Sequence, residues 1–169
     1  MGTQGTAAAR KARSSAANTV KAKQCAECRK CKTELPKDDL RRKMALTTFA
    51  EGSPDAPSTE YEAIASTFKN RVGAPGFPKT AEGVFTAKDR KGRYQFQGYG
   101  SKQYKKAEAG NLDPKECAAL KRAVDAVNKV QDNGSPDAYK NYTFFADANA
   151  KRKYTGDVIG GTAFGDKEF

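Results

Sequence analysis

The chain has 169 residues, enough for one domain with a terminal extension, and it contains no histidine. The absence of histidine excludes the usual general base of proteases, nucleases and esterases, and also the commonest metal ligand. No apolar run reaches the roughly 18 residues of a membrane-spanning helix. The net charge of +11 suits a polyanionic partner such as nucleic acid, anionic lipid or an anionic cell wall.

Residues 1–37 form a basic segment that carries +7 of the total charge and has few apolar residues to bury. We interpret this segment as a flexible tail or interdomain linker that precedes a folded domain over residues 38–169. It has no continuous apolar stretch, so it is not a Sec-type signal. Its charge is consistent with binding to a polyanion and equally with a solvated, disordered tail.

Three cysteines in this segment, Cys25, Cys28 and Cys31, share a regular spacing, and the fourth, Cys117, lies far downstream. A zinc site built on the cluster is one interpretation, although four zinc thiolates usually come as two close pairs. A disulfide within the cluster, or one from the cluster to Cys117, is another. Free thiols remain a third, and the helical pattern around Cys117 favours a small core residue there.

Residues 38–72 show a helix, a short break and a second helix, with one glutamate on each side of the break. We expect the first helix to begin after Asp38 or Asp39 as its N-cap and to end at Glu51. Gly52 stands where the C′ residue of that helix would stand.

The second helix is expected to open with a capping box, Thr59-x-x-Glu62, which puts Glu60 in its first turn. Its apolar stripe comprises Tyr61, Ile64, Ala65, Phe68 and Val72. A helix C-terminus disfavours a carboxylate and an N-terminus favours one, and burial of Glu51 beside Phe49 would act in the same direction as the helix end. We therefore expect Glu51 to have a raised pKa and to keep its proton, while Glu60 stays ionised.

Two carboxyl groups that differ in this way are what cleavage of a glycosidic bond requires. One acid protonates the leaving oxygen, and a second group assists attack at the sugar carbon. The alternative is that Glu51 and Glu60 are ordinary helix-end glutamates in solvent.

The rest of the chain predicts short elements around one long helix. The long helix has Asp113 as N-cap, Pro114 as its first residue and Glu116 completing a capping box, and it ends at Asn133. The short elements are a loop over 73–78, a capped turn over 81–86, a basic turn over 88–93, an extended piece over 94–97, a weak helix over 101–109, and extended segments over 142–145 and 158–164. The predicted fold class is α+β, mainly α, with a few short strands.

Several motifs, taken in order, resemble the core of SleB-type cell-wall hydrolases. They are Ala50-Glu51, Asn70-Arg71-Val72, Phe77-Pro78, Gly83-Val84, Tyr94-Gln95-Phe96, Thr143-Phe144-Phe145 and Ile159-Gly160-Gly161-x-x-Phe164. The resemblance covers about residues 40–165 and implies a lysozyme-like fold that cleaves the glycan strands of peptidoglycan. The histidine positions of the family carry Thr, Ala and Phe here. The resemblance therefore carries over mainly Glu51, as the catalytic glutamate.

A second resemblance concerns the mechanism. The spacing Glu51-x8-Glu60-x5-Ser66 is similar to the pattern of phage-type lysozymes. It implies that Glu51 is the acid, that Glu60 is a second carboxyl that positions or activates water, and that Ser66 orders this water. The alternative for Ser66 is a hydroxyl on the helix surface.

Four further residues are candidates for binding an N-acetylated sugar by stacking or amide hydrogen bonds. They are Tyr94, Gln95, Phe96 and Tyr142, although aromatic rings in such a pattern more often belong to a core than to a sugar-binding surface. Arg71, expected near the cleft, would favour the carboxylates of the wall peptides.

These features lead to three hypotheses of function, none of which requires a cofactor. The first is an N-acetylmuramidase that hydrolyses the β-1,4 bond between N-acetylmuramic acid and N-acetylglucosamine. The second is a lytic transglycosylase that uses Glu51 alone. The third is a non-catalytic basic module that binds cell wall or nucleic acid, although no nucleic-acid motif is present.

A wall hydrolase acts in the bacterial periplasm or cell wall. Without a Sec signal, the chain is expected to be delivered by a specialised secretion system or a phage, or to be part of a larger protein. It resembles the C-terminal lysozyme module of a secreted antibacterial effector, a toxin class for which a cognate immunity protein is expected.

Overall fold

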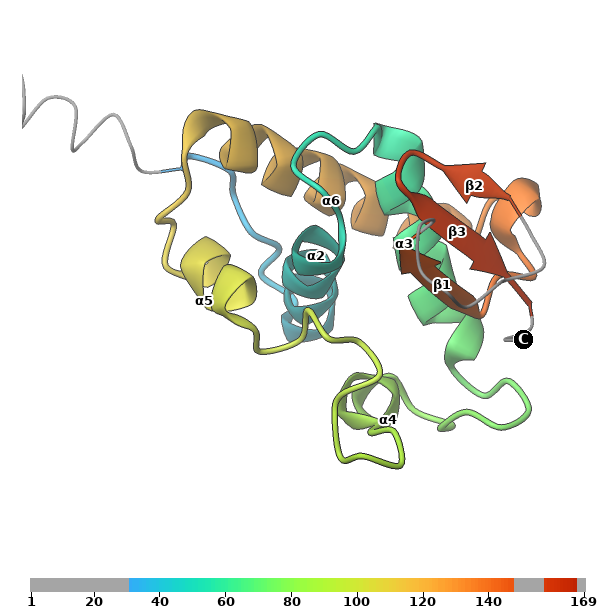
Figure 1. The fold of residues 1–169 in the computed structure, drawn as a ribbon. Coiled ribbons are helices and arrows are strands. Elements are labelled where there is room, and N and C mark those ends of the chain that lie inside the picture. The colour runs from blue at the N-terminus through green and yellow to red at the C-terminus, as the bar shows by residue number, and fades with distance from the viewer. Residues whose placement is uncertain (1–30, 148–156, 167–169) are drawn as a thin grey trace, which may run out of the picture.

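The computed structural model describes residues 31–147 and 157–166, which form a mainly helical domain with one small sheet (Figure 1). The elements are α2 (Asp39–Glu51), α3 (Ser58–Arg71), α4 (Ala81–Thr86), α5 (Lys102–Glu108), α6 (Pro114–Asn133), the 3₁₀ turn η1 (Asp137–Tyr139), β1 (Phe144–Asp147), β2 (Val158–Ile159) and β3 (Thr162–Gly165). The predicted fold class, α+β and mainly α, is confirmed. Among the helices of the described ranges, none has both the length and the apolar character needed to cross a bilayer.

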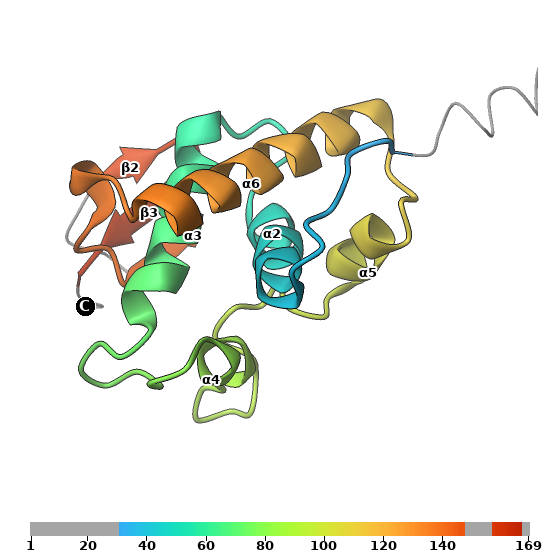
Figure 2. The same cartoon turned by 180° about the vertical axis from the view of Figure 1, so that it is seen from behind.

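Helix α6 is the element against which α2 and α3 pack, as the two opposite views show (Figures 1 and 2). Its start is confirmed in detail, because the Asp113 carboxylate accepts from the Glu116 N–H while the Glu116 carboxylate accepts from the Asp113 N–H. Its buried face consists of Glu116, Ala119, Leu120, Ala123, Val124, Ala126, Val127 and Val130. The alanines on this face let the two other helices approach closely, so that one core joins all three.

Two details of the central helices differ from expectation. Helix α3 begins at Ser58 after Pro57, and no side chain caps it, so the predicted capping box at Thr59 is wrong. Gly52 has an extended backbone and not the left-handed one of a C′ glycine. A Cβ on Gly52 would lie 2.5 Å from the ring of Tyr61, so a close approach is the reason for glycine there.

The sheet has the order β1-β3-β2, and both pairs are antiparallel. The predicted single segment over 158–164 is therefore a hairpin, with Gly160 at its turn in the left-handed region (φ 61°). The sheet lies against α3, where Ala63 and Ile64 meet Tyr142 and Phe164 in a second apolar cluster. Residues 94–97 do not form a strand, since only Tyr94 makes an isolated bridge.

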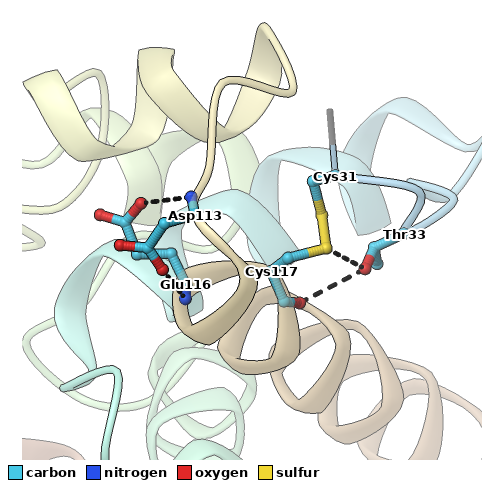
Figure 3. The surroundings of a disulfide bond; sticks show 5 residues. All are labelled: Cys31, Thr33, Asp113, Glu116 and Cys117. Atoms are coloured by element: carbon cyan, nitrogen blue, oxygen red, sulfur yellow. Dashed lines mark hydrogen bonds between the residues drawn. A yellow bond between two sulfur atoms is a disulfide. The ribbon is translucent and has the colours of Figure 1, made fainter. Parts of the chain in front are cut away.

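A disulfide joins Cys31 to Cys117 in the first turns of α6 (Figure 3). The Thr33 hydroxyl donates to the Cys117 carbonyl oxygen at 3.4 Å, and the Cys31 N–H donates to the Gly110 carbonyl oxygen at 3.1 Å. Leu35 packs against the main core. The packed part of the chain therefore includes residues ahead of the boundary predicted at residue 38.

The disulfide selects among the alternatives for the cysteines. Cys117 is not a free core residue, and the sulfur of Cys31 is bonded to Cys117, so a zinc site that uses Cys31 as a thiolate is contradicted. Cys25 and Cys28 lie outside the described residues. Within those residues, no group of three or more Cys, Asp or Glu side chains is arranged to hold a metal ion.

Removal of the disulfide should lower the stability of the domain. Because the bond closes a loop with a sequence separation of 86 residues, the double variant Cys31→Ser/Cys117→Ser should lose about 2–5 kcal/mol of unfolding free energy. Urea denaturation measures this loss. Reductant should bring the wild type to the level of the variant and leave the variant unchanged; equal stability of the oxidised wild type and the variant would contradict the assignment.

Candidate functional site

One cleft of about 1310 Å³ runs between the helices and the sheet, and both glutamates line it. Its lining residues come from the end of α2, the two ends of α3, the loop over 74–77, the turns over 89–97, the segment over 140–146 and the β2–β3 hairpin. The lining residues that bear on the chemistry are Glu51, Glu60, Arg71, Phe77, Gln95, Gln97, Phe144, Phe145, Gly161 and Thr162.

Glu51 is the last residue of α2, and the chain around Gly98 crosses directly over this helix end. The Gly98 N–H donates a hydrogen bond to Oε1 of Glu51. A Cβ on Gly98 would lie only 3.0 Å from Ala50 and from the backbone nitrogen of Glu51. So close an approach of the backbone favours a residue without a side chain, so Gly98 is a candidate site position that was not expected from the sequence. The glycines at 98 and 100, which close the predicted extended piece, were the available signal.

The environment of Glu51 favours its protonated form. Burial of the carboxyl raises its pKa above the ordinary value, and the Gly98 hydrogen bond and the positive charge of Arg71 oppose this shift without reversing it. The predicted increase in the pKa of Glu51 is thus supported. Its main cause is burial of the carboxyl and not the position of Glu51 at the end of a helix. Because Oε1 accepts from Gly98, the proton of the acid form is directed to Oε2.

Glu60 lies in the first turn of α3, as predicted, and is only 1% exposed. The Gly161 N–H donates to its Oε2 at 3.1 Å, and the Thr162 hydroxyl donates to its Oε1 at 2.9 Å. Both donors belong to the β2–β3 hairpin. The structure therefore brings Glu51 and Glu60 to the same cleft. Unlike Glu51, Glu60 has both carboxylate oxygens hydrogen-bonded to the hairpin that forms part of the cleft wall.

Arg71 lies in the cleft at the last turn of α3, as predicted, but its guanidinium is enclosed by the protein. Its carbon lies 4.7 Å, 5.1 Å and 5.5 Å from the ring centres of Phe96, Phe77 and Phe144. Its Nε donates to the Thr143 carbonyl oxygen at 2.6 Å. Arg71 thus joins α3 to the start of β1 and places a positive charge near Glu51.

Of the predicted sugar-binding residues, Gln95 lines the cleft, together with Gln97. The three aromatic candidates do not. Tyr94 is 37% exposed and packs edge-on against Tyr99, and Phe96 is buried in the main core. Tyr142 stacks on Phe164 and donates its hydroxyl to Asp157. The aromatic rings that line the cleft are instead Phe77, Phe144 and Phe145.

Ser66 is fully buried in the middle of α3 and is not among the residues that line the cleft. Positions six apart on a helix differ by about 240° around its axis, so Ser66 faces away when Glu60 faces the cleft. The surface alternative for Ser66 is therefore wrong, and the structure does not bring its hydroxyl to the water that it was predicted to order.

Comparisons of the chain with protein-family models, with curated proteins and with solved structures find no match. The chemistry of the site is therefore set by its own residues. They are Glu51 with a raised pKa, Glu60 held by the cleft wall, and amide and aromatic side chains along an open cleft.

Replacement of Glu51 should stabilise the protein in a pH-dependent way. Since the folded pKa is raised, the stability associated with Glu51 is fully present below the unfolded pKa of about 4.3 and is lost as pH rises through the folded pKa. Glu51→Gln should therefore melt higher than the wild type at pH 7, with the difference shrinking towards pH 4. Thermal melts across this range test the sign, and exposed Glu108→Gln is the control. A lower melting temperature for Glu51→Gln at pH 7 would count against a desolvated acid.

Gly98→Ala should weaken whatever reaction depends on Glu51. The added methyl group pushes the loop away from the end of α2, which displaces the hydrogen-bond donor of Glu51. Because small misplacements of catalytic groups are costly, activity should fall by up to about 100-fold. Turnover assays with a parallel melting curve measure this effect. An unaltered turnover rate would show that Gly98 does not contribute to the reaction.

Proposed function

We propose that the chain is a peptidoglycan hydrolase, an N-acetylmuramidase, with Glu51 as the general acid. The observation that carries the proposal is the raised pKa of Glu51, whose carboxyl lines an open cleft and accepts a hydrogen bond from Gly98. The volume of about 1310 Å³ exceeds the roughly 300–1,000 Å³ of small-molecule pockets, which suits a polymer such as a glycan strand.

In the proposed reaction, Oε2 of Glu51 gives its proton to the oxygen between N-acetylmuramic acid and N-acetylglucosamine. The bond from this oxygen to C1 of the muramic sugar breaks as positive charge develops on the sugar ring. A water molecule attacks C1, its oxygen forms the new bond to C1, and the proton that it loses returns through solvent to the carboxylate of Glu51, which restores the acid. Until then, Gly98 and Arg71 stabilise the negative charge on Glu51.

The remaining lining residues suit an N-acetylated sugar. Gln95 and Gln97 offer amide donors and acceptors, and the rings of Phe77 and Phe144 offer apolar faces for sugar or acetyl groups. Arg71, expected from the sequence to attract the peptide carboxylates, has no such role in this reaction, because its Nε and the faces of its guanidinium are engaged within the protein.

Lytic transglycosylase activity is the second candidate. It is favoured by one observation, that Glu60 is 1% exposed and its two oxygens accept from the hairpin. In that reaction Glu51 acts alone, the 6-hydroxyl of the muramic sugar attacks C1, and no water is consumed. The product is an anhydro sugar, lighter than the hydrolytic product by one water molecule, so mass spectrometry of digested peptidoglycan separates the two reactions.

Glu51→Gln should abolish lysis of cell walls. Glutamine has the same shape and still accepts from Gly98, but it has no proton to donate to the leaving oxygen. Loss of a general acid typically costs about 10²–10⁴ in rate. Release of soluble muropeptides from purified walls measures this loss. Unimpaired lysis by Glu51→Gln would favour the third hypothesis, a basic binding module without chemistry at this site.

Action on peptidoglycan assigns the reaction to the bacterial periplasm or cell wall, where the Cys31–Cys117 disulfide would persist. Delivery by a specialised secretion system or a phage, or as part of a longer protein, belongs to the same proposal. A toxin of this kind would have an immunity protein that plugs the cleft, and a pull-down from the producing cell with this domain tests for that partner.

A further inference from the structure

We infer that Glu60 is a positioning residue, which fastens the β2–β3 hairpin to the first turn of α3 and so holds one wall of the cleft in place. This inference rests on the proposed function of the cleft as a glycan-cleaving site. It reassigns the second carboxyl from a group that reacts with water to a group that acts through the hairpin.

The first support is the geometry of the carboxylate. Glu60 is 1% exposed, and its two oxygens accept from different residues of the hairpin, the Gly161 N–H and the Thr162 hydroxyl. A carboxylate with this burial and these donors is fixed in orientation by the hairpin, and it has little surface left for a water molecule.

The second support is the shape of the turn. Gly160 has a φ of 61°, and a Cβ at this position would lie 1.9 Å from Oε2 of Glu60 and 3.0 Å from Cδ of Pro57. The backbone of the turn therefore sits directly on the carboxylate. Only glycine satisfies both the backbone conformation and the lack of space, which explains the glycine at position 160.

The third support is the place of the contact, at the turn of the hairpin. Strand β2 has only two residues, of which Val158 is 63% exposed and Ile159 packs against the second apolar cluster. Strand β3 is anchored further along by Phe164, which is buried in the second apolar cluster. Because Gly161 and Thr162 line the cleft, movement of the turn would change the cleft wall itself.

The decisive comparison is Glu60→Gln against Glu60→Ala. Glutamine can accept from Gly161 and donate to the Thr162 oxygen, so it keeps both contacts while it removes the charge. We expect its kcat/KM on soluble glycan fragments to stay within about three-fold of the wild type. Alanine removes both contacts, and we expect at least about a ten-fold loss, mainly through KM, because the wall that binds substrate loosens.

Two variants of Thr162 test the other partner of the hydrogen bond to Glu60. Thr162→Val removes the hydroxyl without touching the carboxylate, and Thr162→Ser keeps it. We expect faster amide hydrogen exchange over residues 158–165 and a raised KM for Thr162→Val and for Glu60→Ala. Protection should be close to wild-type in Thr162→Ser and Glu60→Gln.

Two outcomes would overturn the inference. One is a Glu60→Gln enzyme as inactive as Glu51→Gln with an unchanged exchange pattern, because Glu60 would then act by its charge. The other is wild-type exchange in the hairpin of Glu60→Ala. If the wild type has no glycan-cleaving activity, the proposed function fails, but the exchange measurements still decide the role of Glu60.

Discussion

The carboxyl of Glu51 is partly buried where the chain around Gly98 crosses the end of α2, and the candidate site depends on this contact. The close approach has two effects of opposite sign on the carboxyl. It removes water, which favours the protonated form, and it supplies one N–H, which orients the group and moderates the shift. For a general acid, burial helps to retain the proton before the reaction, and the hydrogen bond from Gly98 helps to stabilise the carboxylate after the proton has left.

Helix α3 organises the rest of the cleft because each of its ends fastens a different part of the wall. At its first turn, Glu60 binds the β2–β3 hairpin. At its last turn, Asn70 donates to the carbonyl oxygens of Tyr139 and Tyr142, and Arg71 donates to that of Thr143. Between these ends, one face of α3 packs on α6 and another on the sheet (Figure 1). Helix α3 therefore connects the core to the parts of the cleft wall at its two ends.

Much of this arrangement could be predicted from local rules. The caps at Asp38, Thr80 and Asp113 depend on a few neighbouring residues, and all three accept an N–H from the first turn of their helix. Glu51 was expected at a helix end beside a break, which also depends only on nearby Gly and Pro residues. Consistency between local signals and the final fold is what a well-specified sequence should show.

The parts that could not be predicted depend on contacts between distant segments. The partner of Cys31 is 86 positions away, and no spacing rule identifies it. Periodicity places Phe96 and Tyr142 in extended segments but does not say that the core covers them, and it cannot show that Gly98 lies over Glu51. Ser66 was misplaced for a different reason: the spacing of phage-type lysozymes puts it six positions after Glu60, on a face of α3 that does not line the cleft.

The most direct test of the account is an NMR titration of the Glu51 side-chain carboxyl, with Glu51→Gln used to assign its signal. The account predicts that Glu51 titrates clearly above the ordinary value of about 4.3, and that wall-lysing activity falls with rising pH over the same range in which the group loses its proton. A Glu51 that titrates at or below the ordinary value, with activity that does not follow its protonation, would contradict its assignment as the proton donor.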